Sequence, residues 1–316
     1  DIVAAEEYAV LLPGSEASLV AISEHRDSLE PRVQVGLPPR DVVQRALDKT
    51  MLLEAAAGVG LAAPPTIVAD APGEAPRQAD ALGFPVILKP ATSFVRDGDA
   101  LRQRSAEIAT SPDEVSALAP DFGTPFVIQR YEDRPVLSCA GVISDDGVVA
   151  LAVARYSRTW PIGAGPSSYS VTITPPDGLR DRIAALLETI GWRGIFQIQL
   201  LELEEGFATL DFNPRIFGSL ELAVAAGANL PAVWADIVLG RSVEPVTARK
   251  GVHYRWEEGD SKYFVTQLGR VRIREAANVL VPRRRTAHAC FRVDDPLPLA
   301  AAFASLVGRS RWRRRP

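Results

Sequence analysis

Apolar and polar positions alternate most clearly over residues 194–213, where the pattern predicts a β-hairpin. A half-buried strand is expected first, then a turn at residues 204–206, then a second strand. On the second strand Asp211 and Asn213 are two positions apart, so their side chains point to the same face. Gln199, on the partner strand, can meet them on that face.

The rest of the pattern predicts alternating helices and strands without internal repeats. Periodic apolar positions predict helices over residues 41–57, 75–82, 179–190, 219–226 and 231–239. Strands are expected over residues 86–90, 105–110, 125–131, 136–143, 148–156 and 168–173. A loop is expected at residues 91–99, and the region from Val243 onward is expected to mix short strands with one helix, residues 297–307.

The composition is that of a folded globular protein with a sizeable core. The chain has 316 residues, 47% of them hydrophobic and 23% charged, and its net charge of −4 gives no reason to expect a nucleic-acid partner. Its two cysteines, Cys139 and Cys290, cannot form a disulfide framework, so a reducing compartment, the cytoplasm, is expected. No apolar run approaches the roughly 20 residues that cross a bilayer, so no membrane partner is expected.

The two ends of the chain carry separate signals. The chain begins with Asp1 instead of Met, and no basic start with an apolar stretch follows, which predicts a trimmed N-terminus without a secretory signal. The arginine-rich residues 309–316 are expected to be a solvated end, with a nucleic-acid-binding tail as the alternative.

The hairpin residues suit a magnesium site. The Asp211 carboxylate with amide oxygens from Asn213 and Gln199 is a hard, all-oxygen ligand set that suits Mg²⁺ held between protein and nucleotide phosphates. Arg215, just past the strand, can place a guanidinium beside those phosphates. Gln197 shares the face of Gln199 and competes for its role. A merely solvated polar face is the alternative interpretation.

Four motifs follow one another along the chain: Asp48-Lys49, Phe84-Pro85-Val86-Ile87-Leu88-Lys89-Pro90, Phe126-Val127-Ile128-Gln129-Arg130-Tyr131 and Asp211-Phe212-Asn213-Pro214-Arg215. In this order they resemble the ATP-grasp superfamily, most closely its carbamoyl-phosphate-synthase-like, predicted carboligase branch. The resemblance covers residues 40–240 and implies an α+β, ATP-grasp fold of two subdomains that grip ATP. We expect these subdomains at 41–130 and 131–245, after the remnant of an N-terminal α/β domain (1–40) and before a C-terminal extension (246–316).

The resemblance also implies roles for individual residues. Lys89 and Lys49 match phosphate-facing lysines, and Ser93 lies in the loop that covers the phosphates. The hinge that reads adenine and ribose matches Gln129, Arg130, Tyr131, Glu132 and Asp133. Gln199, Asp211 and Asn213 match the magnesium ligands, and Arg215 the arginine near the terminal phosphate.

The chain departs from the family pattern at two places. Many relatives carry Glu where this chain has Asp211 and Gln199, which leaves one versus two Mg²⁺ open. The loop of residues 92–99 has a single glycine where relatives often have several, so phosphate contacts would fall to side chains such as Ser93 and Arg96.

On the substrate side, Arg155 and Arg158 are expected to hold a carboxylate and stabilise negative charge as an acyl phosphate forms. Trp160 and Tyr169 would supply an apolar wall. The alternative is that both arginines pair with acids and both aromatic residues pack in the core. Residues 253–260 would either close over the site or fix the C-terminal extension.

The predicted function is therefore an ATP-dependent carboxylate–amine ligase that uses ATP and Mg²⁺ and forms an acyl phosphate. Its partners would be a small-molecule carboxylate and an amine, with a thiol as the alternative acceptor. A homodimer is one option for its assembly. An ATP-binding module without ligase activity is the alternative from another class of protein.

Overall fold

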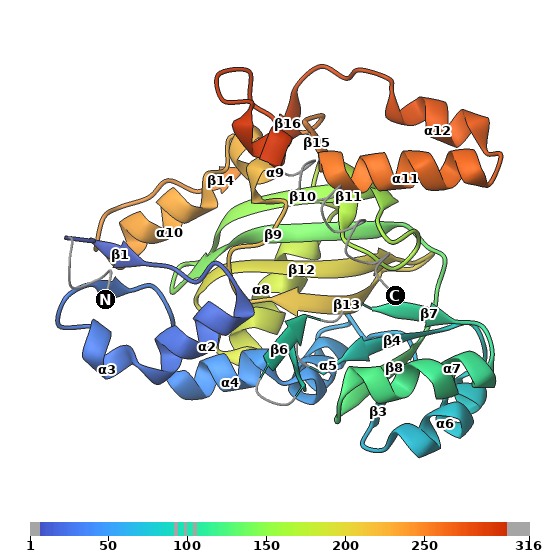
Figure 1. The fold of residues 1–316 in the computed structure, drawn as a ribbon. Helices are drawn as coiled ribbons and strands as arrows, with labels where there is room; N and C mark the ends of the chain where they lie inside the picture. Colours follow the sequence, from blue (N-terminus) through green and yellow to red (C-terminus); the bar gives the residue numbers. More distant parts are fainter. Residues whose placement is uncertain (1–6, 92–93, 98–99, 104–105, 302–316) are drawn as a thin grey trace.

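Two sheets organise the molecule. The computed structural model describes residues 7–91, 94–97, 100–103 and 106–301. In the larger sheet the strand order is β13 (Phe207–Asn213), β12 (Gly194–Glu202), β9 (Val136–Ser144), β10 (Gly147–Thr159), β11 (Ser167–Ile173), β15 (His253–Arg255) and β16 (Thr286–His288). A short strand, β14 (Val246–Thr247), also pairs with β10. The smaller sheet lies at the lower right of Figure 1, beside the end of the larger one.

The smaller sheet is built around two central, largely buried strands. Its order is β3 (Thr66–Ala69), β8 (Phe126–Arg130), β4 (Val86–Pro90) and β7 (Glu107–Ala109), covered by α6 (Ala75–Leu82) and α7 (Pro112–Leu118). Two 3₁₀ turns complete this region, Pro72–Glu74 and Ala119–Phe122. Val86 and Leu88 face the core, and the alternate side chains of β4, Ile87 and Lys89, therefore face the opposite side.

A hairpin stands where a loop was predicted. Strands β5 (Phe94–Asp97) and β6 (Ala100–Gln103) pair antiparallel, so the loop expected at residues 91–99 is wrong in part. Ser93 lies outside the described residues, and the side chains of this hairpin, including that of Arg96, are not described. The phosphate contacts predicted for Ser93 and Arg96 therefore stay predictions.

One face of the larger sheet packs on three helices. These are α4 (Arg40–Leu47), α5 (Lys49–Gly58) and α8 (Leu179–Ile190), and their apolar residues join Trp192, Phe196 and Phe212 in one core. The N-terminal segment adds β1 (Val10–Leu11), α2 (Glu16–Glu24), α3 (Arg26–Leu29) and β2 (Gln34–Val35). Leu19 of α2 belongs to the same core, since a segment of this size buries too little surface to form a core of its own.

The other face of the larger sheet changes from apolar to polar along its length. Its apolar part packs on α9 (Leu220–Ala225) and α10 (Leu230–Val238), with Ile195 and Ala154 among the sheet residues. Farther along the same strands, Gln197, Gln199 and Tyr156 occupy this face. Because side chains alternate strictly along a strand, this polar end continues the face that begins as core.

The C-terminal region contains two helices that the sequence pattern did not predict. They are α11 (Glu257–Gly269) and α12 (Ile273–Val279), and they lie side by side above the larger sheet (Figure 1). A further helix begins at Leu297, as predicted, and its described part ends at residue 301. Within the described chain, no helix is both long and apolar enough to cross a membrane.

Candidate functional site

A cleft of about 850 Å³ lies where the polar ends of the two sheets meet. The smaller sheet contributes Ile87 and Lys89, and the larger sheet contributes Tyr156. Most of the residues predicted to form the site line this cleft: Lys49, Lys89, Gln129, Arg130, Tyr131, Glu132, Asp133, Arg158, Gln199, Asp211, Asn213 and Arg215. The fold therefore brings together residues that are up to 166 positions apart, from Lys49 to Arg215.

The predicted hairpin sets the positions of Asp211 and Asn213. Asp211 pairs in register with Gln199, and Asn213 with Gln197, so all four side chains share one face. Between them Phe212 points to the core, where its ring meets the edge of Trp192 at a centroid distance of 6.0 Å. The buried Phe212 fixes the register, because a one-residue slip would expose it.

A chain of hydrogen bonds orders the amide side of the cleft. Arg215 Nη2 donates to Asn213 Oδ1 at 2.9 Å, Asn213 Nδ2 to Gln197 Oε1 at 3.3 Å, and Gln197 Nε2 to Ser138 Oγ at 2.8 Å. Gln197 is therefore held at both ends of its amide. Gln199 makes no side-chain hydrogen bond to the described residues, so of the two candidates left open by the sequence its oxygen is the freer one.

Two lysines flank Asp211. Lys49 Nζ lies 2.5 Å from Asp211 Oδ1, and the Asp48 side chain caps the helix that begins at Lys49 by accepting from the Thr50 amide. Lys89 Nζ donates to Gln129 Oε1 at 2.8 Å and to the Leu210 carbonyl at 3.2 Å. The register of β12 and β13 shifts at Leu210, so one extra residue stands opposite the partner strand there.

The close packing of these charges changes their ionisation. Burial lowers the pKa of the Lys89 ammonium to about 8, with the nearby charge of Lys49 acting in the same direction and Asp211 opposing it. Burial works against ionisation of Asp211, but the charge and hydrogen bond of Lys49, together with Lys89, hold the pKa of that carboxyl below its ordinary value. The cleft thus contains a carboxylate that stays ionised beside a lysine whose pKa is about 8.

The predicted hinge is partly occupied by the protein itself. The backbone amides of Arg130 and Tyr131 donate to the carbonyls of Pro65 (2.9 Å) and Pro85 (3.0 Å). The side chain of Gln129, 2% exposed, donates to Thr66 Oγ1 at 2.8 Å and accepts from Lys89. The backbone amides of Arg130 and Tyr131, in the hinge predicted to bind adenine, therefore already have hydrogen-bond partners within the protein. Glu132 and Asp133, the next two residues, line the cleft.

The two arginines predicted to contact substrate lie in different environments. Arg155 is not among the cleft residues: its Nη2 lies 2.7 Å from both carboxylate oxygens of Glu202 on β12. Since residues 155 and 156 point to opposite faces of β10, Tyr156 reaches the cleft and Arg155 does not. The geometry thus agrees with the alternative that Arg155 pairs with an acid.

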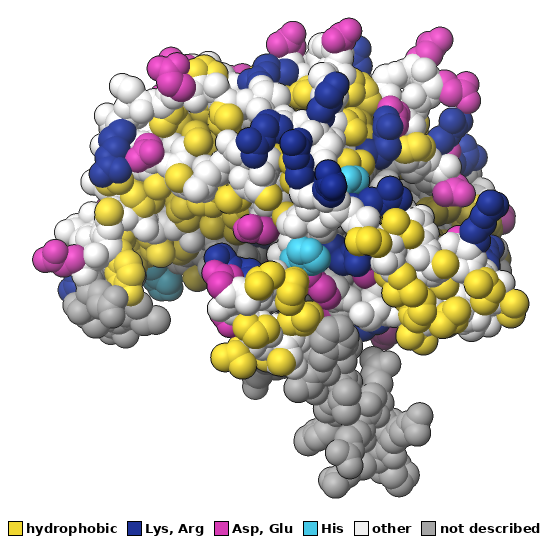
Figure 2. Space-filling model, turned by 90° about the horizontal axis from the view of Figure 1, so that it is seen from above, with side chains coloured by type: hydrophobic (Ala, Val, Ile, Leu, Met, Phe, Trp, Pro, Cys, Tyr) yellow, Lys and Arg dark blue, Asp and Glu magenta, His cyan; other side chains and the backbone are white. Residues whose placement is uncertain are grey.

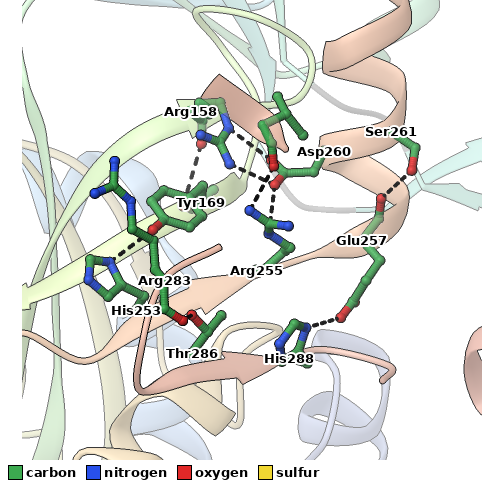
Figure 3. Close-up of polar contacts among 12 residues, drawn as sticks. Arg158, Tyr169, His253, Arg255, Glu257, Asp260, Ser261, Arg283, Thr286 and His288 are labelled. Atoms are coloured by element: carbon green, nitrogen blue, oxygen red, sulfur yellow. Dashed lines mark hydrogen bonds and ion pairs between the residues drawn. The ribbon is translucent and has the colours of Figure 1, made fainter. Parts of the chain in front are cut away.

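Arg158 lines the cleft but is also paired. Its Nε and Nη2 donate to Asp260 Oδ1 (3.0 Å) and Oδ2 (2.6 Å), its side chain is 6% exposed, and its guanidinium stacks 4.2 Å from the Tyr169 ring centre (Figure 3). Arg255 Nε approaches the same Asp260 carboxylate at 3.2 Å. This leaves the Nη1 edge of Arg158 without a hydrogen-bond partner among the described residues.

Asp260 belongs to the segment 253–260 that was singled out from the sequence, but its pairing with Arg158 was not assigned, and Tyr263 of α11 was missed. Asp260 stands in the acidic first turn of its helix, a pattern usually explained by the helix dipole, so the sequence did not identify it as the acid that pairs with Arg158. Tyr263 lines the cleft one turn later. Of the predicted apolar wall, Tyr169 is buried and its hydroxyl lies 3.0 Å from His253 Nδ1, and neither Tyr169 nor Trp160 lines the cleft.

Known proteins resemble this chain in both sequence and fold. Residues 139–260 match the family model described as ATP-grasp in the biosynthetic pathway with Ter operon. The carbamoyl phosphate synthase large chain of Pseudomonas syringae is 23% identical over 235 residues, which cover 69% of this chain and 21% of that relative. The match thus spans about a fifth of the relative's length.

Two solved structures illustrate the shared fold. The biotin carboxylase domain of the 2-oxoglutarate carboxylase of Hydrogenobacter thermophilus, in complex with MgADP, ADP and bicarbonate, has a TM-score of 0.60 at 16% identity and covers 80% of this chain and 58% of its own. D-alanine–D-alanine ligase from Bacillus anthracis, complexed with ATP, has a TM-score of 0.56 at 15% identity, with 74% and 80% covered. The chain has the ATP-grasp fold, and residues 139–260 match a family model of ATP-grasp proteins.

Proposed function

We propose that this chain is an ATP-dependent ligase that joins a carboxylate to an amine through an acyl phosphate. The observation that carries the proposal is a cleft between two sheets in which Lys49 and Lys89 lie beside Asp211, and Arg215 donates a hydrogen bond to Asn213 on the same strand as Asp211. Three cationic side chains gathered in one cleft with a carboxylate suit a polyphosphate and its counter-ion. The solved neighbours with bound MgADP or ATP support the same ligand.

The donor set suits one magnesium ion better than two. The Asp211 carboxylate faces the free amide oxygen of Gln199 across a register pair, and Asn213 Oδ1 lies on the same face. Among the described residues no group of three His, Cys, Asp or Glu side chains comes together, so a second site rich in carboxylates is absent from that part of the chain. Bound there, Mg²⁺ would neutralise phosphate charge, with Gln199, Asp211 and Asn213 as its proposed ligands.

The proposed reaction has two steps. A substrate carboxylate oxygen attacks the γ-phosphorus of ATP, the bond to the β-γ bridging oxygen breaks, and ADP leaves. The amine nitrogen then attacks the acyl carbon, inorganic phosphate leaves, and the amine proton passes to solvent. The charge that develops on the transferred phosphoryl group would be stabilised by Lys49, Lys89 and Arg215, and positioning supplies the rest of the catalysis.

The free edge of Arg158 is the proposed contact for the acid substrate. Because Asp260 occupies its Nε and one Nη2 proton, the guanidinium can offer its outer edge to a carboxylate in the cleft. Tyr263 and Tyr156 flank that region and would bound the size of the substrate.

The test is ATP turnover across pools of carboxylic acids and amino acids, with Mg²⁺ and with hydroxylamine as a general acceptor. We expect one pool to stimulate release of ADP and phosphate, with a hydroxamate or amide found by mass spectrometry. Asp211→Ala should lower turnover by about 100-fold or more with the fold intact. Asp236→Ala, which removes an exposed acid that pairs with Arg241, is the matched control. Tight MgATP binding without turnover in any pool would instead identify an ATP-binding module.

A further inference from the structure

Exposed apolar side chains gather on one part of the C-terminal region, together with arginines that form no ion pair with the described residues. We call residues 265–285, which include the end of α11, its turn and α12, the basic hairpin. Its exposed apolar residues are Val265 (66% exposed), Leu268 (42%), Val271 (79%), Ile273 (59%), Leu280 (68%) and Val281 (39%). In the view from above, hydrophobic side chains gather at the right, over α11 and α12, with Lys and Arg side chains beside them (Figure 2).

The charge of the basic hairpin is opposite to that of the whole chain. It contains six arginines and one glutamate, whereas the chain as a whole carries a net charge of −4. The arginines are Arg270, Arg272, Arg274, Arg283, Arg284 and Arg285, and all six are exposed. None forms an ion pair with the described residues, in contrast to the exposed Arg241 and Arg292, which do.

The tip of the basic hairpin alternates basic and apolar side chains. Arg270, Val271, Arg272, Ile273 and Arg274 follow one another across the turn, and each is exposed. Val271 adopts a backbone φ of 58°, a region that β-branched residues avoid. No packing within the described chain covers this strained, 79% exposed side chain, and strained positions are often found where a protein meets a ligand or partner.

We propose that the basic hairpin docks on an anionic lipid surface, with its apolar tip at the headgroup boundary and its arginines on the lipid phosphates. Clustered arginines attract an anionic leaflet, and apolar side chains among them add affinity by entering the interface. This inference revises the expectation of no membrane partner. It does not depend on the proposed ligase activity.

Other occupants fit the same surface less well. A nucleic acid would use the arginines but would leave five or more exposed aliphatic side chains in water, since direct base contacts favour polar and aromatic groups. A second copy of this chain would bring its own arginines against the first set, and like charges face to face oppose association. An anionic lipid surface satisfies both the charge and the apolar side chains.

The test is co-sedimentation of the full chain with vesicles of phosphatidylcholine alone or mixed with phosphatidylglycerol. We expect binding to the mixed vesicles only, weakening as salt rises. R270Q/R272Q/R274Q should lower the vesicle affinity by roughly 100-fold, because each basic residue near an anionic surface contributes about fivefold. V271N/I273S should lower it by about tenfold at the same net charge, since less apolar surface enters the interface.

Two matched variants control for charge and for exposed apolar surface elsewhere. R32Q/R40Q/R77Q removes the same charge from exposed positions outside the basic hairpin, and V20S/L203S removes exposed apolar side chains. The proposal is overturned if these controls weaken binding as much as the hairpin variants do, or if deletion of residues 309–316 alone abolishes it. Duplex DNA that binds more tightly than the mixed vesicles would identify a nucleic-acid surface, and a dimer by light scattering that V271N/I273S dissociates would identify a subunit interface.

Discussion

The cleft and the basic hairpin are both rich in cationic side chains, but they hold them in opposite ways. In the cleft Lys49 forms an ion pair with Asp211, Lys89 donates a hydrogen bond to Gln129, and Arg158 forms an ion pair with Asp260. On the basic hairpin the arginines have no ion-pair partner among the described residues, whereas the exposed Arg292 outside it pairs with Asp294. A site for a small, highly charged ligand needs donors fixed in advance, because reorganisation would cost binding energy. A surface that meets many anionic groups gains affinity from the sum of loose contacts.

The largest effect on stability is expected at the buried pair. Asp260→Asn leaves Arg158 and Arg255 without their shared carboxylate, so the free energy of unfolding should fall by about 3–5 kcal/mol. Thermal or urea unfolding measures the change. Asp294→Asn, which breaks the exposed pair with Arg292, should leave unfolding unaltered. Equal losses in the two variants would contradict the contrast between buried and exposed charge.

An effect of intermediate size is expected on the affinity for ATP when the pH is raised. The pKa of Lys89 is about 8 in the folded chain and 10.5 when unfolded, so ATP, which favours the charged ammonium, should bind more weakly as pH rises through 8. The loss should reach roughly tenfold one unit above that pKa. Calorimetric titration with ATP from pH 7 upward measures it, and Lys89→Met should remove the dependence.

Rising pH should weaken ATP binding at Lys89 but increase the contribution of the same lysine to the stability of the fold. Between pH 8 and 10.5 the unfolded chain keeps the Lys89 proton that the folded chain has lost, so the contribution of this group to stability rises with pH. Lys250→Met, at an exposed position, is the control and should leave both pH profiles unchanged. An ATP affinity that is flat in pH for the unaltered chain would place Lys89 away from the phosphates.

Substitutions in the basic hairpin are expected to have the smallest effect on the free energy of unfolding and on ATP turnover. R270Q/R272Q/R274Q should change the free energy of unfolding by no more than about 0.5 kcal/mol, because these side chains have no partner to lose within the described chain. Its ATP turnover in solution should match that of the unaltered chain. A large loss of stability would show that these arginines support the fold instead of an outside contact.

Much of the cleft could be predicted because its signals are local. The alternation in residues 194–213 places Asp211, Asn213 and Gln199 on one face, and the structure confirms that arrangement. Lys89 ends a buried strand, as expected. Arg155 was harder to assign, because the predicted strand allowed either face and its partner Glu202 lies 47 positions away.

The C-terminal region could not be predicted in the same way. The turns of α11 mix glycine, acids and aromatic residues without an apolar stripe, so periodicity gave no helix there. The β5–β6 pairing was missed because short polar strands resemble a loop in sequence.

The sequence by itself determined the class of fold, the polar hairpin and the positions of the two lysines, because strand alternation and motif order can be read along the chain. Only the tertiary structure decided that Asp260 holds Arg158 and that arginines and aliphatic residues share one exposed surface. It also decided that, among the described residues, the Gln197 side chain is hydrogen-bonded and that of Gln199 is not. Pairing and exposure depend on which distant segments meet, and no local pattern contains that information.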